Sequence, residues 1–264
     1  MVLPYRKIFQ QAYEISRNNR FLWIFGLFLV LPNLLNFSGW SSVTETDWIS
    51  LVTLIFFILV YFRARAGMIF ALKRILEKQN SSFKQAVSAS RLFYARLLLI
   101  TVLITLVWII LGIVLALPVV YMANRHHIGQ AWILGIFAGA IWIAMFVPTY
   151  LAQALAPLFV VMYNFKIRES LDLAFSLVRK FLGSLAVLGL ILFLLQILPI
   201  VFFSFLAYYT DSLTMRILGA AVIFLIEIVL EVFQQSVWVL AFLELVKPQK
   251  FEEEERVAPI PEVI

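Results

Sequence analysis

Two carboxylates and two amides lie close together within a long apolar stretch near the end of the chain, at residues 216–246. Glu227, Glu231, Gln234 and Gln235 follow one another at helical steps, which places them on one face of a helix. A charged group at the centre of a membrane-length helix costs about 2.5–3.5 kcal/mol to insert, so such groups usually serve a function. The pattern predicts a site that binds a proton or a cation, or that couples transport.

The same four residues also have a structural interpretation. Carboxyl and amide groups hydrogen-bond between transmembrane helices and stabilise their packing by about 0.6 kcal/mol each. The predicted layout places no basic residue at the depth of Glu227 and Glu231, so the two acids are expected to lack a charged partner. Both interpretations remain open.

A second polar set is predicted from the lengths of three long apolar segments. Arg65, Gln153 and Gln235 each lie twenty-two residues past the expected start of their segment, at residues 43, 131 and 213. If the three helices form one bundle, these side chains form a polar ring toward its cytoplasmic side. The alternative is ordinary interfacial placement, in which the long Arg65 side chain reaches the lipid headgroups.

The composition indicates a membrane protein. Of the 264 residues, 63% are hydrophobic and only 14% are charged, whereas soluble domains are about 45–50% apolar and about 25% charged. Cysteine is absent, and His126–His127 lacks a third ligand at suitable spacing, so no metal site and no cofactor are expected. The basic residues fall between apolar segments and form no nucleic-acid module.

The order of segments predicts an all-α, polytopic protein with a six-span domain at residues 1–246. Amphipathic, interfacial helices are expected at residues 4–20, 83–94 and 166–180. Residues 131–164 are expected to form one helix kinked at Pro148, because the sequence there lacks strong turn residues. Residues 247–264, with Glu252–Glu255, read as a disordered acidic tail. The expected spans cover residues 21–36, 43–62, 97–122, 131–164, 181–209 and 213–246.

The distribution of basic residues predicts the orientation. Nineteen of the 21 Lys and Arg residues fall on one side of this layout, and only Arg125 and Arg216 fall on the other. Because basic residues accumulate in cytoplasmic loops, both termini are expected in the cytoplasm. The basic face would attract anionic headgroups of the membrane lipids.

An internal repeat accompanies this layout. Residues 9–17 and 83–91 are identical at five of nine positions, and residues 171–179 keep Ala174 and Arg179 as a weaker third copy. Each copy precedes a span that contains Leu-Pro and then a long apolar helix. Three two-span repeats are therefore predicted, at about residues 4–78, 82–164 and 166–246. Chance similarity between amphipathic helices is the alternative.

The opening of the chain, Phe9-Gln10-Gln11-Ala12 followed by residues 17–27, resembles a known group of sequences. It is similar to uncharacterised bacterial six-span membrane proteins related to the membrane domain of glycerophosphodiester phosphodiesterases. The resemblance implies an inner (plasma) membrane location. In those enzymes the activity belongs to a separate soluble barrel that this sequence lacks, so the resemblance carries over no catalytic residue and implies no enzyme.

Two classes of function follow from these patterns. The first is a non-enzymatic membrane module that interacts with lipids or assembles with a protein partner or a second copy of itself. The second is a small transporter or channel that uses Glu227 and Glu231. A membrane enzyme acting on lipids ranks third, because the acids have no visible catalytic partner.

Overall fold

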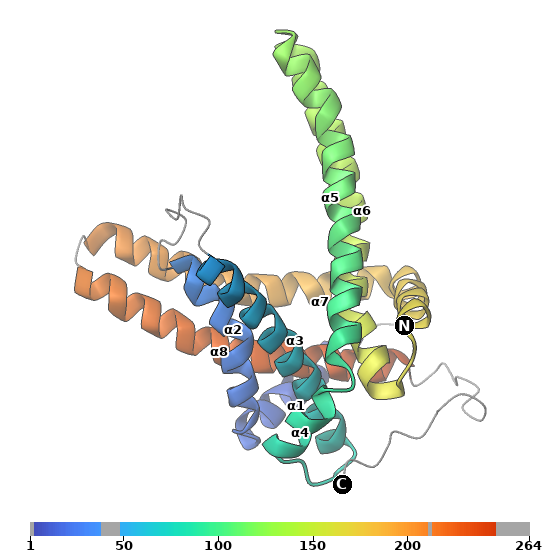
Figure 1. The fold of residues 1–264 in the computed structure, drawn as a ribbon, viewed down its shortest axis with the longest axis vertical. Coiled ribbons are helices and arrows are strands. Elements are labelled where there is room, and N and C mark those ends of the chain that lie inside the picture. The colour runs from blue at the N-terminus through green and yellow to red at the C-terminus, as the bar shows by residue number, and fades with distance from the viewer. Residues whose placement is uncertain (1–2, 38–47, 211–212, 247–264) are drawn as a thin grey trace.

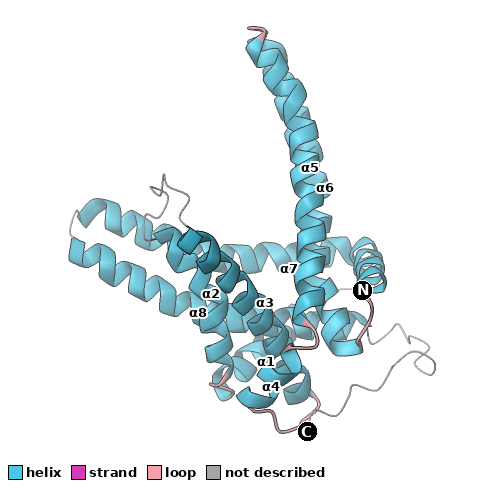
Figure 2. Ribbon diagram, in the orientation of Figure 1, coloured by secondary structure: helices cyan, strands magenta, loops and turns pink. Residues whose placement is uncertain are grey.

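The chain forms eight α-helices in a computed structural model (Figure 1) that describes residues 3–37, 48–210 and 213–246. Within these ranges there is no strand (Figure 2). The predicted acidic tail at residues 247–264 lies outside them. The helices are α1 (Tyr5–Asn18), α2 (Leu22–Phe37), α3 (Trp48–Leu76), α4 (Phe83–Ser90), α5 (Tyr94–Asn124), α6 (Ile128–Tyr163), α7 (Ile167–Thr210) and α8 (Leu213–Val246).

Among the residues that the structure describes, five helices are long and apolar enough to cross a bilayer, since about 20 apolar residues are needed for its ~30 Å core. Because the described residues form helices and no strand, the predicted all-α class is confirmed. The apolar part of α2, Leu22–Pro32, is shorter than these five. The five segments are Ile55–Leu76, Tyr94–Asn124, Ile128–Tyr163, Ile167–Phe202 and Leu218–Val246.

Two predicted boundaries can be compared with the helices. The prediction of one helix across Pro148 is confirmed, since α6 continues through both Pro148 and Pro157. The predicted surface helix at 166–180 and the following span form one element, α7, with a kink at Phe181, where φ is −124° and ψ is 26°. The kink lies where the charged residues end and the apolar sequence begins.

The buried core lies where the C-terminal halves of α3, α6 and α8 meet. Leu72, Phe159 and Phe242 come from these three helices and are almost completely inaccessible. The rings of Phe159 and Phe242 pack edge to face with centroids 4.7 Å apart. These helix ends supply most of the buried apolar surface, so the core stabilises one end of the molecule.

Three amphipathic segments cover this core. Ala12 of α1, Ala86 of α4 and Ala174 of α7 are each 0% exposed, and they occupy the same position in the three copies of the repeated motif. A small side chain at this position lets the helix backbone approach its neighbours closely. The basic residues of the motif, Arg17 and Arg91, are exposed on the opposite side.

Helices α5 and α6 form a long hairpin that extends away from the remaining helices (Figure 1). Its outer part is coated with exposed apolar side chains, such as Ile113, Ile136 and Phe137. A soluble protein would not expose such a surface, whereas lipid tails solvate it.

The base of α6 is held by hydrogen bonds to the C-terminal end of this helix. Lys73 of α3 donates from Nζ to the carbonyl oxygen of Met162 at 2.7 Å. Arg96 donates from Nη1 to Oδ1 of Asn164 at 2.8 Å, and Asn164 ends the helix in the left-handed conformation, with φ 56°. Cationic groups stabilise a helix C-terminus because the last carbonyl groups carry partial negative charge.

Candidate intramembrane polar site

The site is built by three helices that converge above the core. Helix α8 carries Glu227, Glu231 and Gln235, while α3 contributes Arg65 and α6 contributes Gln153. All three pairs among these helices are in contact. The structure thus brings the two predicted polar sets into one region.

Arg65 connects α3 to α6 and keeps one hydrogen-bond donor without a partner. Its Nη2 donates to the backbone carbonyl oxygen of Gln153 at 3.5 Å, which is long for a hydrogen bond. Its Nε is buried and has no hydrogen-bond partner. A buried guanidinium donor without a partner is costly, and this N–H can still donate to a further acceptor group.

Glu231 accepts a hydrogen bond from its own helix. Gln235 donates from Nε2 to Oε1 of Glu231 at 3.0 Å. Glu231 also interacts electrostatically with Arg65 and with Glu227. The expectation that the acids lack a basic residue at their depth is therefore wrong. Helix α3 extends beyond residue 62 alongside α8, and this overlap depends on tertiary packing that spacing within a single helix does not specify.

The three residues of the predicted ring come together through Glu231. Arg65 reaches the backbone of Gln153, whereas Gln235 is linked to Arg65 only by way of the Glu231 carboxyl group. Hydrogen bonds join Arg65 to Gln153 and Gln235 to Glu231, and an electrostatic interaction relates the two pairs.

Two tyrosines that the sequence interpretation missed belong to the same region. Tyr61 of α3 and Tyr150 of α6 both interact electrostatically with Arg65 and Glu231. Tyr61 precedes Arg65 by four residues and Tyr150 precedes Gln153 by three. Residues at these spacings share a helix face, so a search one turn from each polar residue would have found both tyrosines.

The two remaining α8 residues differ in their contacts. Gln234 donates from Nε2 to the carbonyl oxygen of Leu192 at 3.3 Å and so ties α8 to α7. This contact agrees with the packing interpretation for Gln234. Glu227 is 6% exposed and acts on Glu231 from one turn away.

The site lies close to the layer of the amphipathic helices. Gly26, one turn into α2, packs against α8 at Ile228 and Val232, on either side of Glu231 in sequence. The ring of Phe9 in α1 stacks on that of Phe233, with centroids 5.8 Å apart. Glu231 therefore lies on the part of α8 that packs against α1 and α2.

The site reaches the molecular surface. Tyr150 is 41% exposed, and Arg65 and Glu231 are half-buried. Exposed polar atoms in a membrane-spanning helix need a polar neighbour wherever they meet lipid tails, because the tails cannot hydrogen-bond.

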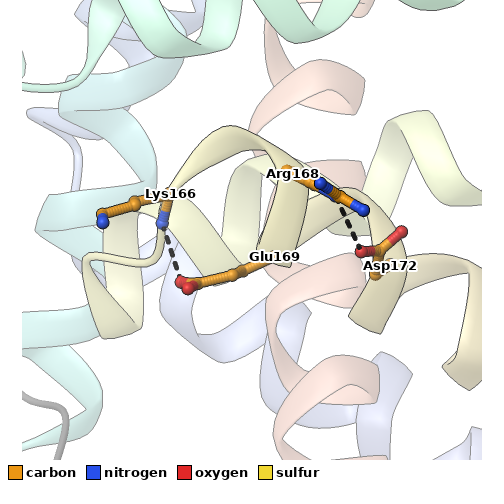
Figure 3. Close-up of polar contacts among 4 residues, drawn as sticks. All are labelled: Lys166, Arg168, Glu169 and Asp172. Carbon is orange, nitrogen blue, oxygen red and sulfur yellow. Dashed lines mark hydrogen bonds and ion pairs between the residues drawn. The ribbon is translucent and has the colours of Figure 1, made fainter.

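Other charged groups have simpler roles. At the start of α7 (Figure 3), Glu169 accepts the backbone N–H of Lys166 at 3.4 Å and caps the helix. Arg168 and Asp172 form an exposed pair at 3.9 Å, of a kind that contributes little stability. Over the described ranges, no three His, Asp or Glu side chains gather as a metal site.

The helix lengths and hydropathy define a polytopic membrane protein. No protein-family model, curated protein or solved structure matches the chain.

Proposed function

We propose that the chain is a six-span, non-enzymatic module of a bacterial inner membrane that binds lipids through its cytoplasmic face. The observation that carries the proposal is the layer of three amphipathic segments around the packed helix ends. Such helices lie in the headgroup region with their apolar faces inward and their basic residues toward the lipids.

The charges of this layer support the orientation. Exposed basic side chains occur on all three segments, including Arg17, Arg91 and Arg179, and they belong to the side that the charge bias assigns to the cytoplasm. Each Lys or Arg near an anionic membrane surface contributes about 1 kcal/mol of attraction.

The six-span count and the internal repeat belong to this proposal. Helix α2 would be the sixth span, short because it begins above the surface helix α1. The repeat is supported by the common burial of Ala12, Ala86 and Ala174 and by the order of amphipathic segment, span and long helix in each unit. The resemblance to the membrane domains of glycerophosphodiester phosphodiesterases is compatible with the same arrangement.

A triple variant tests the lipid-binding face. Arg17→Gln, Arg91→Gln and Arg179→Gln together should reduce the amount of anionic phospholipid that copurifies with the full-length protein, measured by lipid mass spectrometry. Arg125→Gln, in the α5–α6 turn, serves as the control and should leave it unchanged. Equal lipid content in the triple variant and the native protein would contradict the proposal.

A second candidate is a small transporter or channel. It is favoured by the presence of Arg65 and Glu231 on two helices in contact, because charged groups inside a membrane domain often line a pathway for ions or solutes. Reconstituted protein should then show a pH-dependent flux that Glu231→Gln removes and Gln234→Leu retains. A flux that persists in Glu231→Gln would exclude this use of the carboxyl group.

A further inference from the structure

The region around Arg65 and Glu231 presents opposite charges from two helices. Arg65 belongs to α3 and Glu231 to α8, and the two interact without an ion pair between them among the contacts of the described residues. We propose that this region binds the headgroup of a zwitterionic phospholipid, with the phosphate on Arg65 and the ammonium group on Glu231. The inference rests on the proposed lipid-binding function and specifies its ligand.

The phosphate position follows from the donors of Arg65. Its Nε is buried without a partner, and its bond to the Gln153 carbonyl is long, at 3.5 Å. A guanidinium presents a planar fork of donors that matches two phosphate oxygens. The hydroxyl groups of Tyr61 and Tyr150 belong to the same electrostatic group and can donate to a phosphate as well.

The ammonium position follows from the acceptors of Glu231. Gln235 occupies Oε1, and no described residue donates to Oε2. An ammonium group supplies N–H donors and a positive charge at that oxygen. Glu227, one turn away, adds acidic character on the same side.

Charge matching selects a headgroup that carries both signs. A purely anionic headgroup would satisfy Arg65 but would also place negative charge beside Glu231. A purely cationic ligand would satisfy Glu231 but would face Arg65. A phosphate joined to a primary ammonium meets both side chains.

The position of the site suits a lipid better than a soluble ligand. Phe233, two residues past Glu231, stacks on Phe9 of α1, the amphipathic helix that we propose to lie in the headgroup region. From Tyr150, α6 runs toward its N-terminus with exposed apolar residues such as Met145 and Ile143. Acyl chains can follow this surface while the headgroup stays at the polar site.

The test compares lipids on the full-length protein by native mass spectrometry. The protein in detergent is offered phosphatidylethanolamine, phosphatidylcholine or phosphatidylglycerol of equal chain length. Phosphatidylethanolamine should bind best, because the trimethylated nitrogen of phosphatidylcholine has no N–H donor and phosphatidylglycerol has no ammonium. Losing one charged hydrogen bond should weaken binding roughly tenfold. The comparison is made in the Arg17→Gln, Arg91→Gln and Arg179→Gln background, which removes the general anionic-lipid face. Phosphatidylglycerol that is retained there as well as phosphatidylethanolamine would overturn the inference.

Variants assign the two ends of the headgroup. Arg65→Gln should lose phosphatidylethanolamine, Arg65→Lys should restore part of it, and Glu231→Gln should remove the preference over phosphatidylglycerol. The matched control is Arg63→Gln, because residues two apart on a helix do not share a face. If Arg63→Gln and Arg65→Gln weaken binding equally, the site is not where we place it. A thermal melt of each variant separates lost binding from lost folding.

Two further outcomes keep this inference distinct from the general proposal. If Arg65→Gln has no effect while the triple variant at Arg17, Arg91 and Arg179 loses anionic lipid, the lipid-binding face stands and the headgroup site falls. If soluble glycerophosphoethanolamine displaces the lipid completely at equal concentration, the ligand is a solute and the lipid assignment is overturned.

Discussion

At the scale of single residues, the polar site depends on how Arg65 and Glu231 are brought near each other. Each has an ordinary helical neighbourhood, and only the contact between α3 and α8 brings their opposite charges near each other. The sequence predicts the common face of Glu227, Glu231 and Gln235 because that face depends on helical spacing alone. It does not predict the pairing with Arg65, which depends on the relative height of two helices.

Lys73 offers a residue-scale prediction about stability. Replacing it with Met keeps the length of the side chain but removes the donor to the Met162 carbonyl. The loss of this charge-assisted hydrogen bond should destabilise the fold by about 1.5–3 kcal/mol. A lower midpoint in a thermal melt of the detergent-solubilised protein would show this.

The control for Lys73 is Lys84→Met. Lys84 is exposed on α4, so its replacement should leave the midpoint within error. Equal destabilisation by the two variants would mean that the charge itself, and not the contact with α6, stabilises the fold.

At the scale of elements, helix–helix distances depend on small residues. A Cβ atom on Gly26 would lie 2.7 Å from the Ile228 carbonyl oxygen and 2.8 Å from Cγ2 of Val232. A backbone oxygen cannot move aside cheaply, so α2 would have to shift away from α8. Because Gly26 lies level with Glu231, such a shift would also disturb the polar site.

Gly26→Ala should therefore destabilise the protein by about 1–3 kcal/mol, the usual cost of overpacking. The matched control is Gly183→Ala on α7, where an added Cβ meets nothing within 4 Å. This control should be neutral or slightly stabilising, because Ala favours helix over Gly. Thermal melts of both variants measure the difference, and identical melts would contradict the close packing of α2 on α8.

Element boundaries divide into those that local sequence specifies and those that it does not. Missing turn residues predict the unbroken α6, and the end of the charged sequence predicts the position of the α7 kink. The projection of the α5–α6 hairpin has no such local cause. Its outer side chains are apolar all round, and the sequence is the same whether neighbouring helices or lipid tails cover them.

At the scale of the whole molecule, the orientation can be tested directly because the chain has no cysteine. Single cysteines at Lys84 and Arg168 should react with a membrane-impermeant maleimide only after the cytoplasmic side is opened. A cysteine at Arg125 should react in intact cells. All three side chains are exposed, so a failure to react would report the membrane side and not burial. The reverse pattern would invert the proposed topology.

The length of the α5–α6 hairpin has a consequence for how it fits a bilayer. At 1.5 Å per residue, α5 and α6 are roughly 46 and 54 Å long, well beyond a hydrocarbon core of about 30 Å. A helix longer than the core relieves hydrophobic mismatch by tilting. Because this hairpin is anchored at its base and free along its outer part, it can tilt without breaking the core.

The tilt of the hairpin would then change with the thickness of the bilayer. Spin labels on cysteines at Ile128 and Leu218, both exposed, should change their separation between nanodiscs of short-chain and long-chain lipids. Labels at Lys84 and Arg168, near the packed base, should keep theirs. A constant distance between Ile128 and Leu218 would mean that the hairpin is rigidly fixed. If this distance changes with lipid chain length, the thickness of the bilayer moves the hairpin beside Tyr150, at the edge of the polar site.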